Sequence, residues 1–449
     1  MTSLTLKRLC CVGCLLGVIL MLTSRSFLQS SFGWAVGGDE CITELTPSAK
    51  PSQKLDGPSD PITQEDDTKL LSDGAILARP SVLLVNSTRK DGCDIFKGQW
   101  IPDPIGPLYS FNTCRQVLTS TQAQNCRDNG RPDNKYEYYK WKPHGCEIPR
   151  LDPLAFLELM KGKTMAVIGD SLARNQYESL ICNLLQAEDG ELRASRTMQR
   201  WYFGTHNFTL IRIWSTFLVQ QSNETFPFAP DDSVKLFLDK ADNFTQFIPE
   251  FDVVIISSGH WWERKTTYIV DGKIQGGYKW TPNVTKVDHN RAFSMAVGTA
   301  LKVIGEIPNY HGLTILKPFS PNHYEGGLWD TGGSCTGKTE PYLPGQAPKN
   351  AFNEMMREKQ LDALELTVQR LNGSKKRNGS KYAVLDIFEA MNYRGDGHPG
   401  PYRSKDPNKR TQRDAKGPPP QDCLHWCMPG PVDTINQLLF ELLKTHLPQ

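Results

Sequence analysis

The chain has 449 residues, of which 39% are apolar, 22% charged and 10% aromatic, and it contains 36 glycines and 31 prolines. This glycine and proline usage is ordinary, which excludes a collagen-like or wholly disordered chain. Basic residues number 51 and acidic residues 49. Dedicated nucleic-acid binders usually carry a strong basic excess, so that class is disfavoured. The length leaves ample material for a large hydrophobic core.

Residues 1–28 are predicted to be a cytosolic tip followed by a signal anchor. Lys7 and Arg8 precede an apolar run at 9–22, and Arg25 closes it. The run is shorter than the roughly 20 residues of a spanning helix, and its length also suits the core of a cleaved signal peptide. We expect the anchor, whose basic flank keeps the N-terminus cytosolic and places the rest of the chain in a lumen.

Residues 29–90 are predicted to be a disordered stem. Segments 46–52 and 58–61 are rich in proline and serine, and no amphipathic period persists through this region. Such a stem would hold a globular body away from a membrane.

Cysteines and N-glycosylation sequons indicate an oxidising secretory compartment. The alternative is a cytosolic enzyme with reduced, buried cysteines, in which the sequons would have no use. The cysteines of the body are Cys93, Cys114, Cys126, Cys146, Cys182, Cys335, Cys423 and Cys427. The sequon asparagines are Asn86, Asn207, Asn223, Asn243, Asn283, Asn372 and Asn378.

Residues 91–150 are predicted to form a cysteine-rich, loop-rich subdomain, and residues 151–449 an α/β domain. In the second region, apolar runs typical of strands alternate with segments of helical periodicity. The alternation favours a parallel sheet flanked by helices. The expected strands are 164–169, 208–214, 217–219, 251–257, 313–317 and 382–387, and the expected helices are 151–160, 172–186, 288–307, 350–371 and 432–443.

The segment Gly169-Asp170-Ser171 contains the candidate nucleophile. Ser171 lies between a predicted strand and a predicted helix, at the carboxyl edge of the sheet, where open α/β proteins place their sites. The helix N-terminus offers N–H groups and positive potential for a developing oxyanion. The alternative is an ordinary helix N-cap, because Asp and Ser are common there.

Asp422 and His425 are the candidate orienting acid and general base. One loop turn can bring them together, so that the carboxylate holds the imidazole and the other ring nitrogen faces the serine hydroxyl. Asp422 could instead cap a turn or helix. Cys423, His425 and Cys427 could instead bind a metal. Structural zinc needs four ligands, however, and these cysteines are expected in disulfides, so no metal site is expected.

Several motifs together resemble the plant trichome birefringence-like proteins. They are 169–176 (GDSLARNQ), 257–262 (SSGHWW) and Asp422-x-x-His425. The segments 93–100 (CDIFKGQW) and 129–133 (NGRPD) resemble the cysteine-rich N-terminal part of that family. The resemblance covers about residues 93–446, and the combination in this order is highly specific.

The resemblance implies a polysaccharide O-acetyltransferase of the Golgi, a type II membrane protein with a fold related to the SGNH (GDSL) esterases. The family's catalytic residues carry over onto Ser171, Asp422 and His425. The implied acceptor is a plant cell-wall polysaccharide. An acetyl donor, for which acetyl-CoA is one candidate, is the implied co-substrate, with no bound cofactor. The resemblance does not choose among xylan, mannan, xyloglucan and pectin.

On this interpretation the reaction is a double displacement through an acetylated Ser171. The tetrahedral oxyanions need fixed donors, and the candidates are Gly259, His260, Arg174 and Asn175. An apolar platform could bind a sugar and exclude water, although some tryptophans are expected to be core residues. The candidate tryptophans are Trp261, Trp262, Trp329 and Trp426.

A basic loop precedes Asp422, and it either attracts an anionic substrate or is simply solvated. It contains Arg403, Lys405, Lys409, Arg410, Arg413 and Lys416. Two other functions stay open. One is a polysaccharide acetylesterase with the same triad, and the other is a non-catalytic wall-polymer binding protein in which Ser171 is incidental.

Spacing and the resemblance together favour two disulfides, Cys93–Cys146 and Cys114–Cys182. The other four cysteines of the body are then expected to pair among themselves. Eight cysteines permit 105 connectivities, so their partners are left open.

Overall fold

The computed structural model describes residues 92–447, apart from 195–197, 407 and 409–420. The predicted anchor and stem lie outside the described residues, as do Lys409, Arg410, Arg413 and Lys416 of the basic loop. Within the described part, every helix is too short or too polar to cross a bilayer.

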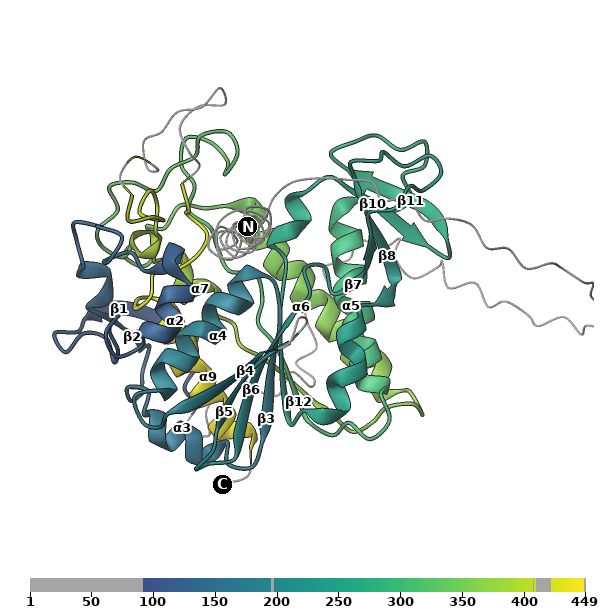
Figure 1. Cartoon of the computed structure of the whole chain (residues 1–449). Coiled ribbons are helices and arrows are strands. Elements are labelled where there is room, and N and C mark those ends of the chain that lie inside the picture. The colour runs from purple at the N-terminus through teal and green to yellow at the C-terminus, as the bar shows by residue number, and fades with distance from the viewer. Residues whose placement is uncertain (1–91, 195–197, 407, 409–420, 448–449) are drawn as a thin grey trace, which may run out of the picture. The chain divides into compact units, whose positions relative to one another are not determined.

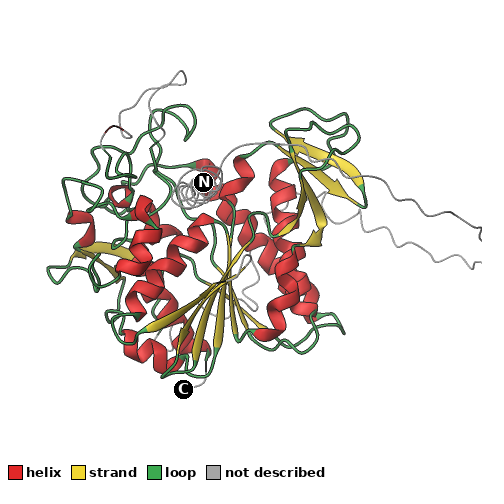
Figure 2. Ribbon diagram, viewed as in Figure 1, coloured by secondary structure: helices red, strands yellow, loops and turns green. Residues whose placement is uncertain are grey.

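A central sheet of seven strands organises the chain (Figures 1 and 2). In spatial order the strands are β13 (Lys381–Val384), β12 (Leu313–Leu316), β9 (Val253–Ser257), β3 (Thr164–Gly169), β6 (Phe208–Trp214), β5 (Met198–Phe203) and β4 (Gly190–Ala194). The first five are parallel, which confirms the predicted parallel sheet flanked by helices. Strands β5 and β4 add an antiparallel edge that the sequence pattern did not predict.

Helices cover both faces of this sheet (Figure 1). On one face lie α3 (Pro153–Leu159), α4 (Ser171–Leu184) and α9 (Val432–His446), and on the other α5 (His289–Glu306) and α6 (Ala351–Asn372). Residues of β3 alternate between two cores: Met165 and Val167 pack with α4 and α9, whereas Ala166 and Ile168 pack with α5 and α6. The strand is therefore apolar throughout because both of its faces are buried.

A second sheet of four strands packs beside α5, and the sequence pattern did not predict it. Its order is β11 (Lys273–Tyr278), β10 (Thr266–Val270), β8 (Val234–Ala241) and β7 (Val219–Ser222). Polar residues and glycines interrupt these strands, which weakens the strand signal. The expected strand 217–219 was misplaced, since β7 begins only at Val219.

The cysteine-rich region forms a small antiparallel sheet of two strands, β1 (Gly98–Pro102) and β2 (Tyr139–Pro143), and α2 (Arg115–Ser120) lies between them in the chain. Short 3₁₀ turns complete the described elements: η1 (Gln122–Gln124), η2 (Lys135–Glu137), η3 (Asn243–Glu250), η4 (His260–Glu263) and η5 (Gly395–Gly397). In this small sheet, Trp100 donates a hydrogen bond to the carbonyl of Ala390 in α7 (Phe388–Asn392) at 2.7 Å.

The eight body cysteines form four disulfides. Cys93–Cys146 and Cys114–Cys182 are the two favoured pairs, and both are confirmed. The remaining four pair among themselves, as expected, as Cys126–Cys427 and Cys335–Cys423. Two of the four bonds join the cysteine-rich region to the rest of the chain, one to α4 and one to the segment just before α9.

Candidate active site

Ser171 is the first residue of α4 and directly follows the turn out of β3. The last residue of β3, Gly169, lies opposite Ser257 at the end of β9 and Trp214 at the end of β6. A Cβ atom on Gly169 would lie 1.7 Å from the Ser257 carbonyl oxygen, so only glycine permits this close approach. The tight turn thereby presents Ser171 at the carboxyl edge of the sheet.

Asp170 caps the helix and ties the serine turn to the loop after β9. One carboxylate oxygen accepts the N–H of Leu172 at 2.9 Å, and the other accepts the N–H groups of Gly259 at 3.0 Å and His260 at 3.1 Å. Although burial opposes ionisation, the nearby His260 and these hydrogen bonds lower the pKa of Asp170 to about 2. The two amides face Asp170, so their expected contribution to an oxyanion hole is not seen.

Asp422 and His425 form the predicted pair. The Nδ1 atom of His425 lies 2.9 Å and 3.1 Å from the two Asp422 carboxylate oxygens. Burial alone would raise the pKa of Asp422, but His425 and, at 3.6 Å, Arg403 hold this pKa well below its usual range. The carboxylate is therefore ionised. The other ring nitrogen of His425, Nε2, is buried and has no hydrogen-bond partner among the described residues.

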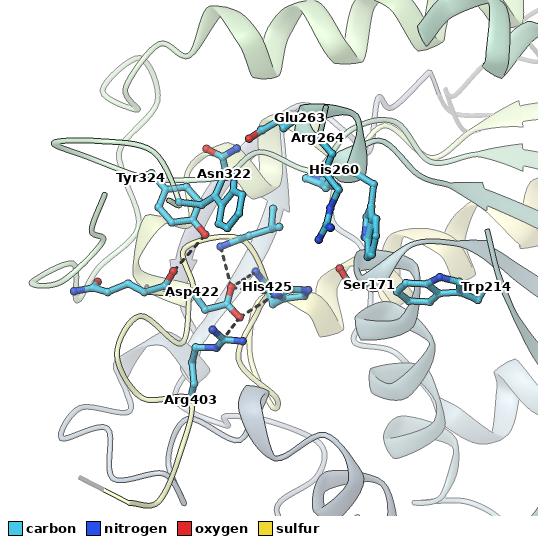
Figure 3. Close-up of a pocket in the computed structure, with 14 residues that line it drawn as sticks. Ser171, Trp214, His260, Glu263, Arg264, Asn322, Tyr324, Arg403, Asp422 and His425 are labelled. Atoms are coloured by element: carbon cyan, nitrogen blue, oxygen red, sulfur yellow. Dashed lines mark hydrogen bonds and ion pairs between the residues drawn. The ribbon is translucent and has the colours of Figure 1, made fainter. Parts of the chain in front are cut away.

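Ser171 and His425 face one cavity of about 320 Å³ (Figure 3). Within the described part of the chain, Nε2 of His425 has no hydrogen-bond partner, so no hydrogen bond joins this atom to Ser171. Such contacts are often long in a ligand-free site and tighten with substrate. Besides Ser171, Asp422 and His425, the cavity is lined by Trp214, His260, Trp261, Glu263, Arg264, Asn322, Tyr324, Trp329, Arg403, Gln421 and Leu424.

The predicted oxyanion donors Arg174 and Asn175 are placed differently. Neither lines the cavity. Arg174 lies 3.9 Å from Glu178, one helical turn along α4. Asn175 is buried, and its side chain binds both backbone groups of Trp426. Asn175 thus holds the loop that carries His425.

The candidate tryptophans divide into two groups. Trp261 and Trp329 line the cavity, whereas Trp262 and Trp426 are each 1% exposed and belong to the hydrophobic cores. The prediction that Trp262 contacts substrate is therefore wrong. Large apolar rings are easily buried, and these two fill gaps beneath the site.

Trp214 and Arg264 are cavity residues that sequence reasoning missed. Trp214 is 41% exposed, and its ring lies edge-on to Trp261 at 6.1 Å. The Arg264 guanidinium lies 3.9 Å from the centre of the Trp261 ring, and burial lowers the pKa of Arg264. The signal for Trp214 was present, since it ends a predicted strand at the same sheet edge as Gly169.

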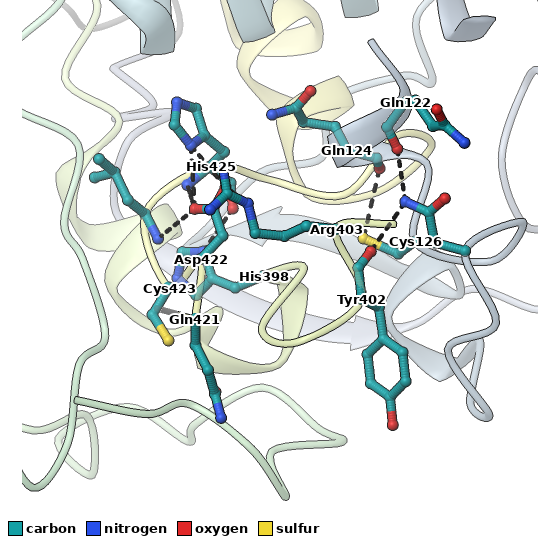
Figure 4. Close-up of polar contacts among 12 residues, drawn as sticks. Gln122, Gln124, Cys126, His398, Tyr402, Arg403, Gln421, Asp422, Cys423 and His425 are labelled. Carbon is teal, nitrogen blue, oxygen red and sulfur yellow. Dashed lines mark hydrogen bonds and ion pairs between the residues drawn. The ribbon is translucent and has the colours of Figure 1, made fainter. Parts of the chain in front are cut away.

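Cys423 and Cys427 cannot bind a metal together with His425, because neither is a free thiol. Cys423 is bonded to Cys335 and Cys427 to Cys126, so neither can supply a thiolate. The two disulfides instead bracket His425 and fix the loop on both sides. Figure 4 shows Cys423 next to Asp422, and Cys126 beside Gln124 and Tyr402.

The parallel sheet flanked by helices is the fold of the GDSL/SGNH-like acyl-esterases. The model of the GDSL/SGNH-like acyl-esterase family found in Pmr5 and Cas1p matches residues 148–442, and the PMR5 N-terminal domain matches residues 91–147. The chain therefore belongs to this acyl-esterase family, and within it to the trichome birefringence-like proteins.

Three of the chain's relatives come from two plants. The chain is 54% identical over 357 residues to protein trichome birefringence-like 18 of Arabidopsis thaliana, a match that covers 78% of the chain and 66% of that relative. It is 50% identical over 359 residues to protein YLS7 of the same plant, covering 78% and 70%. It is 36% identical over 370 residues to xyloglucan O-acetyltransferase 4 of Populus trichocarpa, covering 81% and 84%.

Proposed function

We propose that this protein is a polysaccharide O-acetyltransferase that acts through Ser171, His425 and Asp422. The observation that carries the proposal is the unpaired Nε2 of His425, which faces the cavity lined by Ser171 while Nδ1 is held by an ionised Asp422. Membership of an acyl-esterase family and a relative named as a xyloglucan O-acetyltransferase support it. The acceptor is then a cell-wall polysaccharide and the co-substrate an acetyl donor.

The reaction has two half-reactions. In the first, His425 Nε2 takes the Ser171 proton while Oγ attacks the acetyl carbonyl of the donor, and the leaving group departs with that proton. In the second, a sugar hydroxyl gives its proton to His425 and attacks the acetyl-serine carbonyl. The bond from the acetyl carbon to Ser171 Oγ then breaks, and His425 returns the proton to Oγ. Asp422 fixes the imidazole orientation and stabilises the imidazolium without taking the proton itself.

Charge on the tetrahedral intermediates must be stabilised near the start of α4. The N–H of Ser171 lies in the first helical turn, where it has no intrahelical acceptor. The neighbouring N–H of Leu172 is occupied by Asp170. The Arg264 side chain adds a cation to the cavity wall. We assign the Ser171 N–H and Arg264 as the oxyanion donors.

The acceptor is bound by the exposed indole rings. Trp214 and Trp329 are 41% and 43% exposed, and with Trp261 they line the cavity that holds Ser171. Apolar sugar faces can stack on such rings, and their polar hydroxyls stay free for reaction. A stacked acceptor also excludes water, which favours transfer of the acetyl group over hydrolysis.

We place this protein in the Golgi membrane as a single-pass type II protein with a lumenal body. Its four disulfides support an oxidising compartment. Sequons throughout the chain and the basic, apolar start of the sequence agree with that topology.

The experiment is to incubate the purified body with an acetyl donor and a panel of deacetylated wall oligosaccharides, with Ser171→Ala alongside. We expect acetylated oligosaccharide and a transient acetyl-Ser171 detected by intact mass. Release of free acetate without transfer would instead identify an acetylesterase. Oligosaccharide binding with no turnover, unchanged in Ser171→Ala, would identify a binding protein.

A further inference from the structure

Two buried histidine rings lie directly behind the loop that carries His425. His323 follows β12 and His398 follows η5, and they are 8% and 3% exposed. The Nδ1 atom of His323 lies 2.7 Å from Nε2 of His398. The outer ring nitrogens contact carbonyl oxygens: His323 Nε2 that of Asn392 at 3.0 Å, and His398 Nδ1 that of His425 at 2.7 Å. Figure 4 shows His398 beneath Asp422 and His425.

These three contacts need three ring protons. A carbonyl oxygen can only accept, so each outer ring nitrogen must carry a hydrogen. The contact between His323 Nδ1 and His398 Nε2 needs a third hydrogen to be attractive. Two neutral imidazoles carry only two ring protons in total. A neutral pair would therefore leave two lone pairs facing each other at one of the three contacts.

We propose that His323 and His398 share one additional proton and that this proton makes them positioning residues for His425. The inference rests on the proposed role of His425 as the catalytic base. With the proton present, the chain of hydrogen bonds runs unbroken from Asn392 through both rings to the carbonyl of His425. When the proton is lost, one contact becomes repulsive and the loop that carries the base loses a support.

Some groups around His323 and His398 favour the positive charge of the extra proton, and others oppose it. Burial lowers the pKa of both rings. The carboxylates that favour the proton are Asp396, Glu325 and Asp422, and the cations that oppose it are Lys338, Arg131 and a protonated His425. The indole of Trp426 stacks on His398 at 4.2 Å, which favours a cation on that ring. The balance of these groups sets the pH at which the shared proton is lost, and the proton is lost as the pH rises.

The pair acts on catalysis through the backbone on either side of the His425 ring. His398 holds the carbonyl of His425, and Asn175 holds the N–H and carbonyl of Trp426 from α4. The position of Nε2 relative to Ser171 depends on both. Misplacement by about 1 Å can cost about 100-fold in rate. Loss of the shared proton should therefore lower kcat as the pH rises, while leaving KM nearly unchanged.

Two substitutions of His323 separate positioning from general stability. His323→Asn puts an amide N–H near the position of Nδ1, which can donate to His398 Nε2 without any extra proton. His323→Leu is similar in size but cannot donate. We expect His323→Leu to lower kcat at least tenfold with KM within twofold. His323→Asn should recover most of the rate and lose the alkaline fall in kcat. Equal kcat and pH profiles in His323→Leu and the wild type would overturn the proposal.

NMR of the ring nitrogens detects the proton shared by His323 and His398 without any catalytic turnover. In protein labelled with ¹⁵N-histidine, we expect three protonated nitrogens in the His323–His398 pair at low pH and two at high pH, in wild type and in Ser171→Ala. Two neutral rings from pH 5 to pH 8 would overturn the shared proton. If Ser171→Ala retained transfer, the proposed mechanism would fail, and the ring titration would still decide the protonation of the pair.

Discussion

Asn175 binds both backbone groups of Trp426, 251 residues away in sequence. Its Oδ1 accepts the N–H of Trp426 at 2.8 Å, and its Nδ2 donates to the Trp426 carbonyl at 3.3 Å. Asn175 lies one turn beyond Ser171 on α4, and Trp426 directly follows His425. One buried side chain therefore sets the distance between the helix of the candidate nucleophile and the loop of the candidate base.

Asn175→Asp should impair catalysis more than it impairs folding. The aspartate can still accept from the Trp426 N–H, but its second oxygen would face the Trp426 carbonyl and repel it. We expect kcat to fall at least tenfold and the free energy of unfolding to fall by about 1–3 kcal/mol, the usual effect of an unsatisfied buried polar group. Kinetics and urea unfolding measure the two effects. Asn290→Ala, at an exposed position of α5, is the matched control, and an Asn175→Asp enzyme as active as this control would refute the positioning role.

If Ser171, His425 and Asp422 act together, the losses of acetyl-transfer rate in their variants should not add. Ser171→Ala and His425→Ala should each reduce acetyl transfer by several orders of magnitude, and the double variant should be little worse than either, because the residues act as a unit. Asp422→Ala should be milder, since the carboxylate orients the base and transfers no proton. Transfer rates and thermal unfolding are measured for each variant. Strictly additive losses, or retained transfer in folded Ser171→Ala, would end the covalent mechanism.

Much of the central sheet could be predicted, because its buried parallel strands are continuous apolar runs. The second sheet could not, since β10 and β11 mix threonine, glycine and lysine with apolar residues. Ser171, Asp422 and His425 were identified from local motifs, and the structure brings them to one cavity. The roles of Asn175 and His398 could not be predicted. They depend on contacts with Trp426 and His425 that no local pattern records.

Trp214 should matter for the acceptor and not for formation of the acetyl-enzyme. Trp214→Ala removes an exposed ring from the cavity wall and admits water there. We expect the KM for oligosaccharide to rise about tenfold and the ratio of hydrolysis to transfer to increase, with little change in the acetylation of Ser171. Phe228→Ala, which truncates a side chain that is 90% exposed outside the cavity, is the control. An unchanged ratio of hydrolysis to transfer would argue against the stacking role.

Glu178 should make the protein less stable as the pH rises. Burial raises the pKa of this carboxyl to about 7, with Arg174 and Arg212 opposing the shift. A carboxyl whose folded pKa lies above its unfolded value of about 4.3 contributes stability at low pH that is lost as the pH rises towards 7. The full effect is on the order of 3 kcal/mol. Burial also raises the pKa of Asp433, to about 6, so this carboxyl likewise lowers the stability of the protein as the pH rises.

Glu178→Gln should therefore flatten the dependence of stability on pH. Urea unfolding at several pH values between 4 and 8 measures the slope, and Glu358→Gln at an exposed position of α6 is the control. The slope should fall in Glu178→Gln and stay at the wild-type value in Glu358→Gln. Identical slopes in both variants would show that Glu178 ionises normally.

Asn378 should be unglycosylated although it lies in a sequon. Its Nδ2 donates to the carbonyls of Ile304 at 2.7 Å and Ile307 at 2.9 Å, at the end of α5. A glycan replaces one of these two amide hydrogens, so it would break a hydrogen bond and leave a helix carbonyl unpaired. The asparagines of five other sequons are exposed: Asn207, Asn223, Asn243, Asn283 and Asn372. Glycopeptide mapping of protein from a eukaryotic secretory host should find glycans among these five and none at Asn378. High occupancy at Asn378 in folded, secreted protein would show that this end of α5 is not held as the structure has it.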